Sequence, residues 1–263
     1  MQGDAVSRAV RIRSGVTRVA PTSNRRVYLT QMSPKARARL AGVFQALEGF
    51  PAVFGQVAVL AMLVDHKDAV VTANNILAHQ GLYRAGFAIP VAAVGFHIVW
   101  ALLLYQLLRP VNQTLSMLGF VVILVGCAIQ AVAALLYLAP LVILGDTADV
   151  AARAELAMSF IGLSSQAFNL YLVFFGLWCV LTGYLIFRST FLPRLLGVLL
   201  IADGIGWMLF LWQPLATAVY PAIAVVAGLA EIPLLLWFLV FGVNEERWLA
   251  VASRTAARSE VGA

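Results

Sequence analysis

The chain of 263 residues is 62% hydrophobic and 11% charged, with a mean hydropathy of +0.91. This composition excludes an ordinary soluble globular domain. A formal net charge of +6 would suit nucleic acid, but the basic residues are concentrated before and between long apolar segments. That arrangement is typical of a membrane protein, so we expect the lipid bilayer as a partner and no nucleic acid.

The apolar segments predict an all-α transmembrane bundle of six helices. A helix rises 1.5 Å per residue, so a hydrocarbon core of about 30 Å requires about 20 residues. The predicted spans are about 40–64, 83–108, 115–144, 156–187, 192–213 and 218–243. Residues 1–39 are expected to form a basic, disordered cytoplasmic tail, with either Met1 or Met32 as the translation start, and residues 244–263 a short second tail.

The basic residues also predict the orientation of the bundle. Nine of the 18 Lys and Arg residues precede the first span. Six more fall in loops on the same predicted side: Arg109, Arg188, Arg194, Arg247, Arg254 and Arg258. The other side has only Lys67, Arg84 and Arg153. By the positive-inside rule, both termini should be cytoplasmic, and we expect a multi-pass protein of the cell membrane.

The connection between the first two spans holds two features on the outer side. Asp68 is placed to cap the N-terminus of a short helix through residues 69–79 that lies along the outer surface. Arg84 lies at the outer mouth of the second span. It is a candidate for binding an anionic group there, and the alternative is a snorkelling or ion-paired arginine.

Four titratable residues lie inside spans: Glu48, His97, Asp203 and Glu231. Counted at 1.5 Å per residue, each is about 12–18 Å from the inner face, close to the midplane. An ionised side chain costs roughly 2.5–3.5 kcal/mol at that depth, so these residues should point into the bundle. We expect at least one of the three acids to hold a proton, with His97 as its partner. The candidate functional site is a polar cavity formed by these four residues.

Other polar features surround these residues. Three amide side chains further toward the outside are candidates to line the cavity: Gln130, Gln166 and Asn169. Proline has no N–H group for a helical hydrogen bond, and Pro51 lies close to Glu48 and Pro233 close to Glu231. Carbonyl groups released in this way can coordinate a cation or ordered water in a broken helix.

Three functions are compatible with this pattern. The first is a transporter or sensor of a small solute, ion or proton, with the acids binding the cargo and His97 as a relay. The second is a membrane-embedded enzyme acting on a lipid-like substrate, and the third is a structural or accessory subunit whose polar groups join helices. No cofactor or metal is expected, because motifs such as His-Glu-x-x-His are missing from the sequence and Cys127 and Cys179 lie in apolar surroundings. The catalytic residues, the substrate and the oligomeric state stay open.

Several short segments resemble the bacterial membrane proteins grouped as domain of unknown function 4386. The match covers roughly residues 38–248 and is most specific between Gly183 and Leu199. The segments are NILAH (75–79) with Tyr83-Arg84, RPVN (109–112), FFGL (174–177), GYLIFRS (183–189), LPRLLGVL (192–199), EIP (231–233), Leu236-Trp237 and GVN (242–244). The resemblance implies an uncharacterised multi-pass membrane protein and brings no established activity.

Overall fold

The computed structural model describes residues 32–53, 58–145 and 149–261. The predicted tail through residue 31 and the choice of start codon lie outside the described residues. Ser33–Ala263 forms one compact unit. Its elements are α2 (Pro34–Val53), α3 (Leu60–Leu63), α4 (Ala69–Ala78), α5 (Gln80–Leu108), α6 (Gln113–Gly145), α7 (Val150–Arg188), α8 (Arg194–Met208), the 3₁₀ turn η3 (Leu209–Leu211), α9 (Gln213–Val240) and α10 (Glu245–Val261).

Five helical segments of the described chain are long and apolar enough to cross a membrane: α5, α6, α7, α8 together with η3, and α9. The prediction of an all-α multi-pass membrane protein is therefore confirmed. The first predicted span, 40–64, coincides with α2 up to Val53 and with α3, and residues 54–57 between them lie outside the described ranges. The sixth crossing, the tail boundaries and the cytoplasmic placement of both termini stay predictions.

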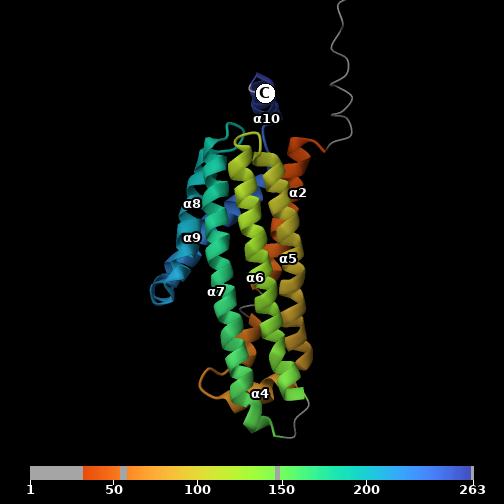
Figure 1. Ribbon diagram of the computed structural model, residues 1–263, viewed down its shortest axis with the longest axis vertical. Coiled ribbons are helices and arrows are strands. Elements are labelled where there is room, and N and C mark those ends of the chain that lie inside the picture. The colour runs from red at the N-terminus through yellow and green to blue at the C-terminus, as the bar shows by residue number, and fades with distance from the viewer. Residues whose placement is uncertain (1–31, 54–57, 146–148, 262–263) are drawn as a thin grey trace, which may run out of the picture. The chain divides into compact units, whose positions relative to one another are not determined.

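The long helices pack in chain order into a closed ring. Helix α2 packs against α5, α5 against α6, α6 against α7, α7 against α8, α8 against α9, and α9 returns to α2. Figure 1 shows α5, α6 and α7 side by side, with α8 and α9 beyond α7. This order turns one side of each helix toward a shared interior, where the larger hydrophobic core includes Trp100, Phe175 and Trp178.

The helices of the ring differ greatly in length. The 39 residues of α7 extend over about 58 Å, whereas the 15 residues of α8 cover about 22 Å. The α8–α9 hairpin therefore lies beside only part of α7, and α4 packs against α6 and α7 at the far end of these helices (Figure 1). The predicted cap of α4 is confirmed, because the Asp68 side chain accepts hydrogen bonds from the N–H groups of Val70 and Val71.

Glycines allow α7 and α8 to touch through their backbones. Gly176 and Gly183 lie seven residues apart on one face of α7, opposite Gly204 and Gly197 of α8. A Cβ atom at Gly183 would lie 2.7 Å from the carbonyl oxygen of Gly197, and one at Gly197 would lie 2.6 Å from the carbonyl oxygen of Gly183. Such close approach increases van der Waals contact between helices that no hydrophobic force drives together in lipid.

The substitution Gly183→Ala should lower the stability of the protein by about 1–3 kcal/mol, because the new methyl group would push α8 away from α7. The measurement is the midpoint of thermal unfolding in detergent micelles. Gly162→Ala is the matched control on the same helix, since a Cβ atom there meets nothing within 4 Å. Equal midpoints for the two variants would contradict the close packing of α7 and α8.

Helix α10 is fastened to the end of the bundle by polar contacts. Trp248 Nε1 donates to the carbonyl oxygen of Leu107 at 2.8 Å, and Thr255 Oγ1 donates to that of Pro110 at 2.9 Å. Gly242 allows the turn from α9 into α10, because its φ of 67° lies in the left-handed region that favours glycine. The segment predicted as a second tail thus contains a helix tied to the α5–α6 connection.

The start of α10 also contacts the start of α2. Glu245 Oε1 accepts a hydrogen bond of 3.1 Å from the backbone N–H of Lys35. A hydrogen bond from the Ser33 side chain and this backbone bond lower the pKa of Glu245 below its ordinary value of 4.5. A pKa lowered by folding means that the ionised carboxylate stabilises the contact above the ordinary pKa, and that this stabilisation is lost as the pH falls through the lowered value.

We therefore expect the contact between α10 and α2 to loosen below about pH 4. Below this pH, hydrogen exchange at the Lys35 amide should become faster relative to the rate of an unprotected amide at the same pH. The variant Glu245→Gln should lose this pH dependence, whereas Glu246→Gln, which changes an exposed neighbour, should keep it. Exchange with the same pH profile in both variants would contradict the role of Glu245.

Candidate functional site

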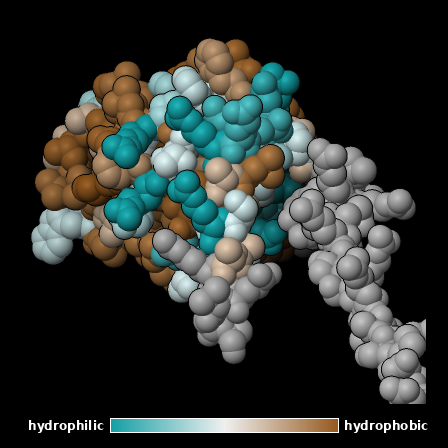
Figure 2. Space-filling model, turned by 90° about the horizontal axis from the view of Figure 1, so that it is seen from above, coloured by the Kyte–Doolittle hydropathy of each residue, from teal (hydrophilic) through white to brown (hydrophobic). Residues whose placement is uncertain are grey.

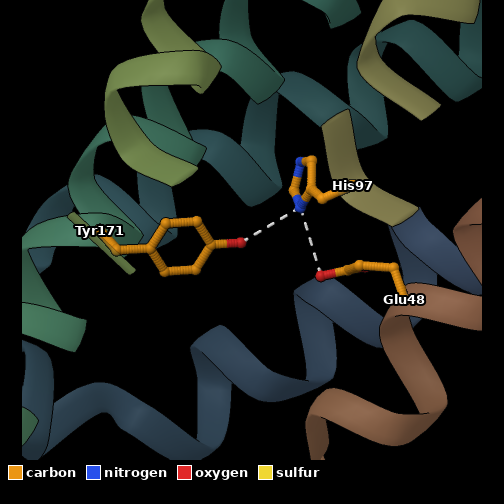
Figure 3. A network of polar contacts seen from close by, with 3 residues as sticks. All are labelled: Glu48, His97 and Tyr171. Carbon is orange, nitrogen blue, oxygen red and sulfur yellow. Dashed lines mark hydrogen bonds and ion pairs between the residues drawn. The ribbon is translucent and has the colours of Figure 1, made fainter. Parts of the chain in front are cut away.

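Two of the four predicted midplane residues are in direct contact. His97 on α5 is fully buried, and its Nδ1 atom lies 3.3 Å from Oε1 of Glu48 on α2, whose side chain is 12% exposed. The hydroxyl group of Tyr171 on α7 lies 3.4 Å from the same Nδ1 atom. Figure 3 shows the glutamate and the tyrosine approaching the imidazole from opposite helices. Three helices of the ring thus meet at one nitrogen atom.

The proton on this nitrogen decides which contact can be a hydrogen bond. If Nδ1 carries a proton, it can donate to the carboxylate of Glu48 but cannot accept from Tyr171. If Nδ1 is deprotonated, the Tyr171 hydroxyl can donate to it, and so can a protonated Glu48. We call these three side chains the histidine network. Its hydrogen-bond partners change when Nδ1 gains or loses a proton.

Aromatic rings enclose His97. The ring centroids of Trp100, Phe175 and Trp178 lie 5.1, 5.7 and 5.3 Å from that of the imidazole. The second ring nitrogen, Nε2, is buried and has no hydrogen-bond partner among the described residues.

Asp203 lies in the interior on α8. It is fully buried, and neither of its carboxylate oxygens has a hydrogen-bond partner in the described part of the chain. The carboxylate lies close to the Cys179 thiol and the Trp207 indole, and Trp207 Nε1 likewise has no partner there. Leaving such groups unpaired is costly in a folded protein, so a buried unpaired carboxylate is a candidate site for a proton or a cation.

Glu231 lies near both Asp203 and the histidine network. This residue of α9 lies within electrostatic range of both Asp203 and Glu48. The carbonyl oxygen of Glu231 accepts a hydrogen bond of 3.2 Å from Nε2 of Gln45, a buried residue of α2. This bond joins the first and last helices of the ring at the level of the acids.

The other candidate residues occupy different environments. Gln130 on α6 is buried, with its Oε1 atom unpartnered among the described residues, and Asn169 on α7 is half-buried. Gln166 is exposed, and its Oε1 atom accepts a hydrogen bond from Gln213 of α9. Arg84 is exposed on the first turns of α5. Gln130 is the buried member of this group.

The chemistry of the interior is acidic, aromatic and sulfur-containing. Cys127 and Cys179 are free, buried thiols. Within the described ranges, no three side chains of His, Cys, Asp or Glu lie close enough together to hold a metal ion. Proton transfer between neighbouring side chains is the chemistry that the contacts of Glu48, His97 and Tyr171 support directly.

Two polar partners escaped sequence reasoning. Tyr171 lies in an aromatic stretch with Phe168 and Phe175, where its hydroxyl group gives no separate signal in the hydropathy pattern. Gln45 lies three residues before Glu48, so both face the same side of α2. That spacing is the signal by which Gln45 could have been found.

Apolar helices arranged in a ring around buried polar groups define a multi-pass integral membrane protein. A family model described as Domain of unknown function (DUF4386) matches residues 40–242, and the chain belongs to this family. A search of curated proteins and a search of solved structures each gave no match.

Because Glu48 and His97 are in contact, substitutions of the two residues should change the free energy of unfolding non-additively. In a double-mutant cycle with Glu48→Gln and His97→Asn, we expect a coupling of about 0.5–3 kcal/mol in the free energy of unfolding in detergent. The matched control pairs His97→Asn with Glu155→Gln, an exposed acid of α7, and should be additive. Additive effects in both cycles would contradict the contact.

Proposed function

We propose that this protein transfers protons within the bilayer, as a transporter that uses the histidine network and the acids Asp203 and Glu231. The observation that carries the proposal is the contact of one buried imidazole nitrogen with both a carboxylate and a hydroxyl group. A histidine is suited to this role because its ordinary pKa lies between pH 5 and 8.

The packing around the network favours a proton over a larger cargo. Aromatic side chains surround His97 closely, and protons need no open pore because they pass between neighbouring titratable groups. Glu48 has the most exposed side chain of the network, so we assign it the exchange of protons with the surroundings. His97 then takes the proton on Nδ1 and returns it to Glu48, and Tyr171 donates a hydrogen bond to Nδ1 while that nitrogen carries no proton.

The acids beyond the network extend the route. Glu231 lies within electrostatic range of Glu48 and of Asp203, so it is the natural intermediate between the network and α8. The carboxylate oxygens of Asp203 lack hydrogen-bond partners among the described residues and are free to accept a proton. In this proposal the protein resides in the cell membrane, with both termini on the cytoplasmic side as the distribution of basic residues predicts.

The proposal predicts proton flux into proteoliposomes that contain a trapped pH-sensitive dye, driven by a potassium diffusion potential. Wild-type protein should acidify the interior faster than protein-free vesicles do. Glu48→Gln should slow the flux about tenfold or more, because an amide cannot carry a proton. Glu155→Gln, which changes an exposed acid of α7, should leave the flux unchanged.

Two results would defeat the proposal. The first is wild-type flux equal to that of empty vesicles. The second is undiminished flux in Glu48→Gln, which would assign the polar contacts to helix association instead. Before reconstitution, each variant is shown to elute as a single species in detergent.

A further inference from the structure

A groove at the α10 end of the bundle combines polar and apolar walls. It has a volume of about 380 Å³ and lies between the α7–α8 turn, the end of α9 and the start of α10. Its polar wall includes Thr190, Asn244 and Arg247, and its apolar wall includes Leu192, Trp237 and Phe241. A volume of this size falls within the range of small-molecule binding sites.

The arginine of the groove is held in place by the chain around it. Arg247 Nη1 donates to the carbonyl oxygen of Thr190 at 3.2 Å. The backbone N–H of Arg247 donates to Oδ1 of Asn244 at 3.0 Å, and the N–H of Asn244 donates to the carbonyl oxygen of Phe191 at 3.2 Å. A guanidinium group has five N–H donors in a fixed fork, so anchoring one side of it presents the others in a defined direction.

The start of α2 lies beside the groove. A Cβ atom at Gly242, which lines the groove, would lie 3.0 Å from Cγ of Lys35. The nearby Glu245 directs its carboxylate to the backbone N–H of Lys35. Figure 2 looks onto this end and shows hydrophilic side chains gathered over it, with apolar residues at the margin.

The apolar wall is an aromatic surface at the end of a membrane-spanning helix. The rings of Trp237 and Phe241 lie 4.6 Å apart, and Phe241 is 59% exposed. Helix α9 ends at Val240 and α8 begins at Arg194, so the groove lies where these apolar helices end. Aromatic and basic side chains at that depth meet the headgroups and the first carbons of the lipid chains.

We propose that this groove binds an anionic phospholipid, with Arg247 on the phosphate and with Trp237 and Phe241 against the start of the acyl chains. The choice of a lipid over a soluble phosphate follows from the apolar wall. A free phosphate would leave Trp237 and Phe241 without a ligand contact, whereas a phospholipid matches both walls. The site is distinct from the histidine network and does not depend on proton transfer.

The test uses the full-length chain in phosphatidylcholine vesicles that contain a minor fraction of brominated lipid, which quenches nearby tryptophans. Brominated phosphatidylglycerol should quench more strongly than the same fraction of brominated phosphatidylcholine. This excess should disappear in Trp237→Phe, which removes the reporter. Arg247→Gln should weaken the apparent affinity for phosphatidylglycerol about tenfold.

The matched control is Arg254→Gln, which removes an exposed charge from the same helix α10 and should leave the excess quenching unchanged. Arg247→Lys keeps the charge but loses the guanidinium fork, so it should give an intermediate affinity. Each variant is first shown to have wild-type helical content by circular dichroism. If Arg247→Gln fails that check, Arg247→Lys and Trp237→Phe decide the question.

Three outcomes would overturn the proposal. Equal quenching by the two brominated lipids would show no preference for an anionic headgroup. Equal losses in Arg247→Gln and Arg254→Gln would indicate general attraction to surface charge. Competition by inorganic phosphate that removes the excess quenching would show that a soluble anion, not a lipid, fills the groove.

Retention of lipid binding in Glu48→Gln would separate this site from the proposed proton route.

Discussion

The backbone contact between α7 and α8 is the constraint on which the interior depends. Gly183 and Gly197 remove the side chains that would separate the two helices, and Gly176 and Gly204 do the same further along. Asp203 directly precedes Gly204, so this contact fixes the level of the buried acid beside α7. In lipid, where apolar surface gains nothing by leaving the solvent, close packing of this kind provides much of the association energy.

The polar groups of the interior then depend on the order of the helices. His97 meets Glu48 because α5 packs against α2, and it meets Tyr171 because α7 faces α5 across the ring. The aromatic rings around the imidazole exclude most other partners. A network with few members and a well-packed surrounding can hold a proton at a defined place, which is the physical basis of the proposed transfer.

Hydropathy predicted the long helices well, because a bilayer requires a nearly continuous apolar segment and α5, α6 and α9 provide one. It placed the start of the first helix at residue 40, whereas α2 begins at Pro34, since a basic first turn carries no apolar signal. Depth could be counted from the sequence, but helix order in space could not. The contact of His97 with Glu48 and Tyr171 therefore needed the three-dimensional structure.

Closure of the ring has a consequence for biogenesis. The bond between Gln45 and the carbonyl group of Glu231 joins segments that leave the ribosome almost two hundred residues apart. In the predicted six-span topology, Glu48 of α2 enters the bilayer long before α9 exists to shelter it. In that topology the surroundings of Glu48 are complete only when translation has delivered the last helix, so assembly of the interior is a late step in insertion.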